Sequence, residues 1–379
     1  MSHLFKKAQF VIETLITAGH EAYFVGGAVR DYMLQRPISD VDIATSATKD
    51  EVIMLFPQTI KVGTTHETVI VKIEDALFEV SRYKGKEPRT LEQDLFYRDF
   101  TINAIAMTKD FALIDPHHYR VDLDSSIIRT SGRAIDRFKE DPLRMVRAIR
   151  FVSQHGFSLE QQTRQAMLEL KALLSNVATE RLTKELDKML LGPHCANAIA
   201  ILQQIQFPTL PMLPKRFMEW TKHPLYKEMT LQERWLLFLQ DSHQPAETQL
   251  RHFKKSNRFI KELQELQAYV RKRNIDGWSL RLLYDCGKDN ILKVERLIHL
   301  LIPEKKENIN NVVYEYERLL LKKRQDLAID GVLVLKETTR EPGKWIEAFL
   351  YEVETAVLYG KLQNEKNEIV AWGRKKGLL

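Results

Sequence analysis

The feature that most constrains this chain is a pair of aspartates inside an apolar segment. Residues 24–45 read FVGGAVRDYMLQRPISDVDIAT, and Asp40 and Asp42 flank a valine near the end of this segment. Residues i and i+2 of a β-strand point to the same face, about 7 Å apart along the strand. Carboxylates so placed repel each other, and divalent cations that share them relieve the repulsion. The pair therefore predicts a strand that carries a metal site.

A pair of glycines precedes the acids and points to the same chemistry. Gly26 and Gly27 allow the backbone to approach an anion closely, and the planar guanidinium of Arg30 can hold phosphate oxygens. The alternative is a solvated strand end, because short D-x-D patterns also occur by chance. The glycine pair directly upstream favours a site that holds Mg²⁺ and a phosphorylated substrate.

Taken together, GGAVRD-x8-DVDIAT resembles the nucleotidyltransferase superfamily and, more narrowly, the class II tRNA nucleotidyltransferases. That group contains the CCA-adding enzymes and their bacterial poly(A) polymerase relatives. The resemblance implies that Asp40 and Asp42 are catalytic and hold Mg²⁺, with Glu79 as a candidate third acid on a neighbouring strand. It also implies a triphosphate that is held by Gly26, Gly27 and Arg30.

Two periodicities divide the chain. From residue 22 to about 128, short β-branched and aromatic segments alternate with turns and helical patterns, which indicates an α+β module with a small mixed or antiparallel sheet. Helices are predicted at residues 28–35, 49–56 and 99–107. After about residue 135, Leu, Ala, Lys and Glu recur at helical spacing, which predicts an all-α remainder.

The resemblance implies a nucleotidyltransferase head followed by an elongated helical neck, body and tail. Pro208, Pro211 and Pro214 cluster at one predicted joint between parts, and Pro303 begins another. The predicted parts are a catalytic head at 1–136, a neck that selects the base at 137–194, a helical body at 195–302 and a tRNA-binding tail at 303–379.

A second polar motif lies in residues 91–107, where Arg98, Asp99 and Asn103 interrupt an apolar run. Asp99 could simply cap the helix that follows it. The segment resembles the RRDFTINA motif of the family, which implies that Arg98 and Asp99 place the sugar and phosphates of the incoming nucleotide, with Asn103 also in the nucleotide site. Tyr97 replaces the first arginine of that motif.

A third motif contains Asp141 and Arg144, for which a plain ion pair on one helix face is the alternative reading. Cytosine and adenine each present an amino donor beside a ring-nitrogen acceptor, which an aspartate and an arginine can match; guanine and uracil present the opposite pattern. The motif resembles the family's EDxxR, which implies base selection without a nucleic-acid template. Arg147 and Arg150 could bind phosphate or be solvated, and residues 180–185 resemble ERxxxE, a brace for this helix.

Composition fits a nucleic-acid partner. The chain has 379 residues and a net charge of +6, with a pI near 9.0, which suits a polyanion such as tRNA without requiring one. Its two cysteines suit neither a disulfide framework nor a zinc site. The N-terminal segment reads as an amphipathic helix rather than a signal peptide, and no stretch is apolar enough to span a membrane. We therefore predict a cytoplasmic protein without a membrane partner.

The segment at residues 81–90, SRYKGKEPRT, is shorter than its counterpart in CCA-adding enzymes. The resemblance assigns that loop to the change from cytidine to adenosine, so the short segment resembles the CC-adding branch. Neutral loop variation is the alternative. The main prediction is transfer of CMP from CTP to a tRNA 3′ end, with a separate A-adding enzyme acting afterwards. The alternatives are full CCA addition from CTP and ATP, poly(A) polymerase activity, and RNA binding without catalysis.

Overall fold

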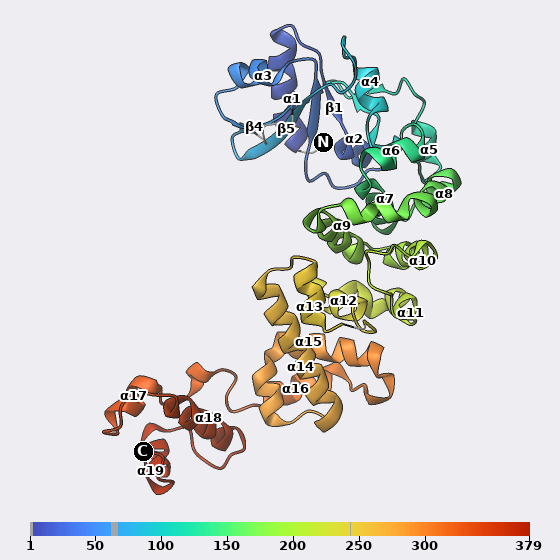
Figure 1. Cartoon of the computed structure of the whole chain (residues 1–379). Helices are drawn as coiled ribbons and strands as arrows, with labels where there is room; N and C mark the ends of the chain where they lie inside the picture. Colours follow the sequence, from blue (N-terminus) through green and yellow to red (C-terminus); the bar gives the residue numbers. More distant parts are fainter. Residues whose placement is uncertain (1–2, 62–66, 243) are drawn as a thin grey trace. The chain divides into compact units, whose positions relative to one another are not determined.

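The computed structural model describes residues 3–61, 67–242 and 244–379 (Figure 1). The chain divides into two compact units, Met1–Leu213 and Pro214–Leu379. The boundary falls at Pro214, a member of the proline cluster for which a joint is predicted. The finer division into head, neck, body and tail stays a prediction.

The first unit is built on a seven-stranded sheet with the order β3-β4-β5-β2-β1-β6-β7. Strands β2 and β5 pair in parallel and the other neighbours pair antiparallel, so the sheet is mixed, as predicted. The strands are β1 (Ala22–Val25), β2 (Asp42–Thr45), β3 (Thr59–Lys61), β4 (Thr68–Ile73), β5 (Ala76–Arg82), β6 (Ala106–Met107) and β7 (Leu113–Ile114).

Three helices in the first part of the sequence follow local signals. Helix α1 (His3–Thr17) buries Phe5 and Leu15 on one face. The predicted helices at 28–35 and 49–56 are present as α2 (Gly27–Met33) and α3 (Lys49–Leu55). A capping box, in which the hydroxyl of Thr48 and the carboxylate of Glu51 satisfy each other's backbone N–H groups, starts α3.

The helix predicted at residues 99–107 is wrong. The segment forms a short 3₁₀ turn, Thr101–Asn103, and then strand β6. Its backbone is used by long-range partners, because the Thr101 N–H donates to the Arg129 carbonyl and Met107 pairs with Phe24 of β1. Tertiary pairing of fully buried residues therefore overrides the local helical pattern.

Helices make up most of the remaining first unit. A short parallel pair, β8 (Ile127–Ile128) with β9 (Ser158–Leu159), is an exception to the predicted all-α character after residue 135. The helices are α4 (Leu91–Phe96), α5 (Arg120–Asp124), α6 (Ala134–Glu140), α7 (Leu143–His155), α8 (Gln161–Leu170), α9 (Thr179–Leu191) and α10 (Cys195–Ile205).

Helices α7 and α9 pack closely because a glycine lies between them. A Cβ at Gly192 would lie 2.1 Å from the hydroxyl of Ser153, so no other residue fits there. That hydroxyl donates to the Met189 carbonyl at 2.5 Å, and the Ser153 carbonyl accepts the His194 N–H at 2.8 Å. The contacts fix the polar faces of the two helices next to each other.

The second unit is entirely helical in the residues that the structure describes, as predicted. Buried ion pairs such as Arg273–Glu295 and Arg296–Glu233, both at 2.8 Å, tie its longer helices together. Its helices are α11 (Phe217–Lys222), α12 (Leu231–Phe238), α13 (Ala246–His252), α14 (Asn257–Asp276), α15 (Leu280–Leu301), α16 (Ile309–Glu317), α17 (Gly331–Lys336), α18 (Trp345–Leu358) and α19 (Lys366–Lys375).

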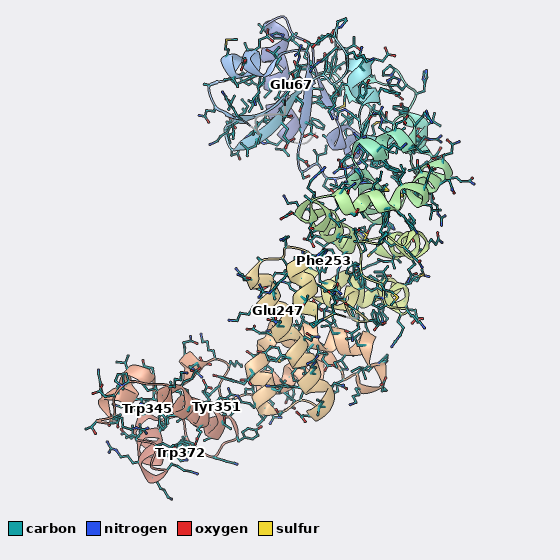
Figure 2. The ribbon with its side chains drawn as sticks, viewed as in Figure 1. Glu67, Glu247, Phe253, Trp345, Tyr351 and Trp372 are labelled. Carbon is teal, nitrogen blue, oxygen red and sulfur yellow. The ribbon has the colours of Figure 1, made fainter. Side chains whose placement is uncertain are left out.

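The last two helices carry Trp345, Tyr351 and Trp372, which are labelled in Figure 2. Phe349 of α18 lies against Trp372 of α19 with ring centroids 6.4 Å apart, so part of this aromatic set packs inside the unit. Among the described residues, no helix is both long and apolar enough to cross a membrane.

Candidate active site

The two aspartates lie at the start of β2, beside the third acid. Asp42 is the first residue of the strand and lies opposite Val25 of β1 and Glu79 of β5. Asp40 lies two residues before the strand and is exposed, so the prediction that both acids belong to one strand is wrong. The pairing stops there on the β1 side because Gly26, with φ 74°, turns the chain into α2.

Asp42 is the electrostatically strained member of the group. Burial raises the pKa of its carboxyl to about 6, and the charges of Glu79 and Asp40 act in the same direction against the opposing effect of Arg98. Both Asp40 and Asp42 line one cavity of about 700 Å³, which we call the acid cavity. Neither has an ion-pair partner among the described residues. A half-buried, unpaired carboxylate next to two others is a chemical environment that fits a divalent cation.

The arrangement offers two carboxylates to a cation rather than a complete cage. In the described part of the chain, no group of three or more His, Cys, Asp or Glu side chains is arranged to hold a metal ion. A cation at Asp40 and Asp42 would therefore complete its coordination with water and substrate oxygens, as is common for Mg²⁺. A role of Glu79 as third ligand stays a prediction.

Gly26 is required by close packing at the acids. A Cβ on Gly26 would lie 3.0 Å from the Asp42 Oδ2 atom and 3.4 Å from the Arg98 Nη1 atom, at a backbone φ of 74° that favours glycine. Gly27 begins α2 and lines the acid cavity. Because Gly26 has no side chain, Asp42 and Arg98 can both lie next to its Cα atom.

Arg30 is buried and is held by two neighbouring side chains. Its guanidinium donates to both oxygens of Asp31 at 2.9 Å and to the side-chain oxygen of Asn103 at 2.7 Å. Asn103 in turn donates to Asp99 at 3.1 Å, and Asp99 accepts from Arg147 at 2.8 and 3.0 Å. This chain of contacts runs from α2 through the 3₁₀ turn to α7.

Asp99 is held as a carboxylate by this network rather than as a helix cap. Burial alone would raise the pKa of its carboxyl, but Arg147, Asn103 and the Phe100 N–H lower it to about 2. The 3₁₀ turn that follows has no side-chain cap. The capping alternative for Asp99 is therefore wrong.

The network continues into α9. Arg147 also donates to Glu185 at 3.2 Å, and Arg150 donates to the same carboxylate at 2.5 Å. The brace predicted for residues 180–185 is present in these ion pairs. Neither Arg147 nor Arg150 is a solvated surface residue, and both line the acid cavity.

A second cavity, of about 440 Å³, contains the third motif; we call it the basic cavity. Asp141 and Arg144 both line it, but they are not paired with each other in this structure. Asp141 accepts from Arg181 of α9 at 2.8 Å, and Arg144 donates to Glu140 at 2.8 Å. Each half of the motif is thus held in place by a separate partner, and the alternative of a plain Asp141–Arg144 pair is wrong.

Sequence reasoning missed the residue that positions Arg98. Asp94 is buried at the end of α4, accepts from Arg98 at 2.8 and 3.1 Å, and accepts the Lys84 backbone N–H at 3.1 Å. The i,i+4 spacing of Asp94 and Arg98 could have indicated this ion pair. No local signal indicates the long-range contact to Lys84.

The structure brings most of the predicted site residues to the two cavities. The predicted residues that line the acid cavity are Gly27, Arg30, Asp40, Asp42, Asn103, Arg147 and Arg150. The basic cavity takes Arg98, Asp99, Asp141, Arg144 and again Arg147. Gly26 and Glu79 line neither cavity but flank Asp42 directly.

Three family models match the chain. They describe a poly A polymerase head domain at residues 22–129, a probable RNA and SrmB-binding site of polymerase A at 156–209, and a putative second domain of tRNA nucleotidyltransferase at 227–372. The head-domain match contains the acids and the glycine pair, and the second match contains α9.

Similar proteins cover the whole chain. The CCA-adding enzyme of Anoxybacillus flavithermus is 39% identical over 98% of this chain and 97% of its own length, and that of Bacillus cytotoxicus is 37% identical over 99% of each. The crystal structure of the Bacillus stearothermophilus CCA-adding enzyme in complex with CTP is 34% identical, with a TM-score of 0.85 over 100% of this chain and 98% of that one. The Thermotoga maritima CCA-adding enzyme complexed with tRNA shares the fold, with a TM-score of 0.69 at 22% identity.

Proposed function

This chain belongs to the CCA-adding enzyme family of tRNA nucleotidyltransferases, and from that premise we propose that it builds the CCA terminus of tRNA from CTP and ATP with release of pyrophosphate. The relatives support this alternative better than the main prediction of CC addition, which rested on the short segment at residues 81–90. A separate A-adding enzyme is then not needed. A cytoplasmic location is part of this proposal.

The observation that carries the proposal is Asp42, whose unpaired carboxylate lies beside Asp40 and Glu79 with a pKa of about 6. In our account Asp40 and Asp42 hold Mg²⁺. The chemistry that bound Mg²⁺ supplies is a lower pKa for the RNA terminal hydroxyl and neutralisation of the leaving pyrophosphate. Both carboxylates line the same cavity and therefore face one substrate space.

The triphosphate is proposed to lie along the start of α2. Gly26 and Gly27 leave the backbone open there, and Arg98 lies within 3.4 Å of the place that a Gly26 Cβ would take. Arg30 is buried, and hydrogen bonds to Asp31 and Asn103 fix the orientation of its guanidinium group. Its guanidinium is paired with Asp31, so we assign it positioning as well as phosphate binding.

The sugar is proposed to lie next to Asp99 and Asn103. Because Asp99 stays ionised far below neutral pH, it is a permanent hydrogen-bond acceptor for a ribose hydroxyl. Arg147 and Asn103 hold this carboxylate from two sides, which restricts where the hydroxyl can bind. Arg150 supports the arrangement through Glu185.

The base is proposed to bind Asp141 and Arg144 in place of their present partners, Arg181 and Glu140. Asp141 would accept from the amino group of cytosine or adenine while Arg144 donates to the ring nitrogen. Arg181 and Glu140 keep the two side chains apart and satisfied until a base arrives. One good bidentate contact of this kind supplies about 1–3 kcal/mol of discrimination.

Product sizing tests the proposal. The full-length protein is incubated with tRNA that lacks its last three nucleotides, with CTP alone, ATP alone, and both. We expect two cytidines with CTP alone and three added residues with both nucleotides. A stop at two residues with both would restore the CC-adding reading, a long ladder with ATP would indicate a poly(A) polymerase, and no extension would leave only RNA binding.

A further inference from the structure

The basic cavity contains more positive charge than its own carboxylates neutralise. Seven basic and three acidic side chains line it. All three acids are already paired: Asp99 with Arg147, Asp141 with Arg181, and Glu185 with Arg147. Arg98 and Arg144 are paired with Asp94 and Glu140 outside the lining, so the excess positive charge lies on the lysines, and it favours an anionic occupant.

Two of these cations form an exposed pair on α9. Lys184 and Lys188 are one helical turn apart, so they lie on the same face, about 6 Å from each other. Both are exposed, whereas Leu186 and Met189 face the core from the opposite side of the helix. Neither lysine forms an ion pair among the described residues.

The position of this lysine pair relates it to the reacting atoms. Lys184 lines the basic cavity only, while Lys188 lines both the basic cavity and the acid cavity that contains Asp40 and Asp42. The pair thus marks a path that leads along α9 away from the acids.

Lys84 is a further cation of the basic cavity. Burial lowers the pKa of its ammonium group, the charges of Arg98 and Arg144 lower it further, and the charges of Asp94 and Asp99 oppose this shift. The cations of the cavity therefore repel one another. An anion between the two walls would relieve this repulsion.

We propose that Lys184 and Lys188 bind backbone phosphates of the acceptor RNA strand next to its reacting 3′ end. This inference rests on the proposed function, because it takes tRNA as the substrate. The triphosphate is assigned to α2 and the acids, and the base to Asp141 and Arg144, so a phosphate beside Lys184 belongs to another molecule. Flexible lysines with no partner suit sequence-independent contacts to a strand.

The test compares the effect of each variant on tRNA with its effect on CTP, across a series of salt concentrations. Lys184→Gln, Lys188→Gln and the double variant are assayed for tRNA binding without nucleotide and for KM of tRNA and of CTP. Each lost phosphate contact should reduce the slope of log Kd for tRNA against log salt by about 0.7–0.9. We expect the KM of tRNA to rise several-fold and the KM of CTP to stay unchanged, with Lys184→Arg restoring the wild-type slope.

Lys72→Gln is the matched control, because Lys72 is an exposed lysine of β4 that lines neither cavity. A slope in the lysine variants equal to that of this control would overturn the inference, and so would a rise in the KM of CTP alone. Wild-type protein that binds tRNA but extends nothing would contradict the proposed function, while the slopes would still decide the role of the lysines. Thermal unfolding of every variant excludes misfolding as the cause.

Discussion

The acid cavity and the basic cavity lie in the same unit and share Arg147 and Lys188, yet among the described residues only the acid cavity has carboxylates without an ion-pair partner. In the acid cavity, Asp40 and Asp42 lack ion-pair partners among the described residues, Arg30 is paired with Asp31, and Arg36 and Lys188 add positive charge. In the basic cavity the carboxylates are paired and lysines remain. The acid cavity therefore offers unpaired carboxylates to a cation, whereas every carboxylate of the basic cavity already has a basic partner.

Between the two cavities the polar network is continuous. Arg147 contacts Asp99 on one side and Glu185 on the other, so the residues that would hold the sugar are fixed by the helix that lines the basic cavity. Catalysis and nucleotide choice should therefore be separable by mutation, while the network that joins them should mainly affect stability.

Removing a carboxylate from the acid cavity should have the largest effect. We expect Asp42→Ala to reduce nucleotide addition by about 10³-fold or more, which corresponds to about 4 kcal/mol of activation barrier, because the cation site is lost. Binding of tRNA, measured by gel shift, should change little. Asp110→Ala, at an exposed position, is the control. Retained turnover in Asp42→Ala would remove this acid from the mechanism.

Breaking the network should have the second largest effect, a loss of folding stability. Glu185 is buried and accepts from both Arg147 and Arg150, so Glu185→Gln leaves the buried Arg150 without its counter-charge and Arg147 with Asp99 alone. We expect the free energy of unfolding to fall by about 3 kcal/mol, measured by urea denaturation. The exposed Glu180→Gln on the same helix should stay near wild type. Equal stability of both variants would show that the two cavities are braced elsewhere.

Changing the basic cavity should affect choice more than rate. Asp141→Ala removes the acceptor for the base amino group. We expect the ratio of kcat/KM for CTP to that for UTP to fall roughly 5- to 150-fold, which corresponds to a loss of about 1–3 kcal/mol of discrimination. The ratio is measured by single-nucleotide addition to truncated tRNA. An unchanged ratio would refute base selection at this residue.

The smallest effect concerns pH at the acid cavity. As pH falls through about 6, Asp42 takes up a proton that competes with the cation, so addition at limiting Mg²⁺ should decline below that pH. Glu79→Gln removes a negative neighbour and lowers the pKa of Asp42, so the decline should move to lower pH by a fraction of a unit. A large loss of Mg²⁺ affinity in this variant would instead make Glu79 a ligand.

Sequence reasoning predicted the parts of this molecule that depend on local pattern. The mixed sheet and the helical second unit both follow from spacing and residue type. The 99–107 helix was wrong because its backbone is committed to β1 and to Arg129, partners that no local pattern indicates.

The sequence indicates which residues form the site but not which residues they contact. Asp141 and Arg144 were expected from their spacing, whereas the contact from Arg181 spans 40 positions in sequence. Asp40 was placed in a strand because alternation continues through Val41, but β1 ends before it can pair that far. Long-range ion pairs and strand ends depend on the assembled fold, and sequence periodicity carries no information about them.

The most direct test is a crystal structure with Mn²⁺ and CTP, in which anomalous scattering locates the cation. The account predicts an anomalous peak bound by the carboxylates of Asp40 and Asp42, with the cytosine edge against Asp141 and Arg144. A cation bound elsewhere, or a cytosine outside the basic cavity, would contradict it.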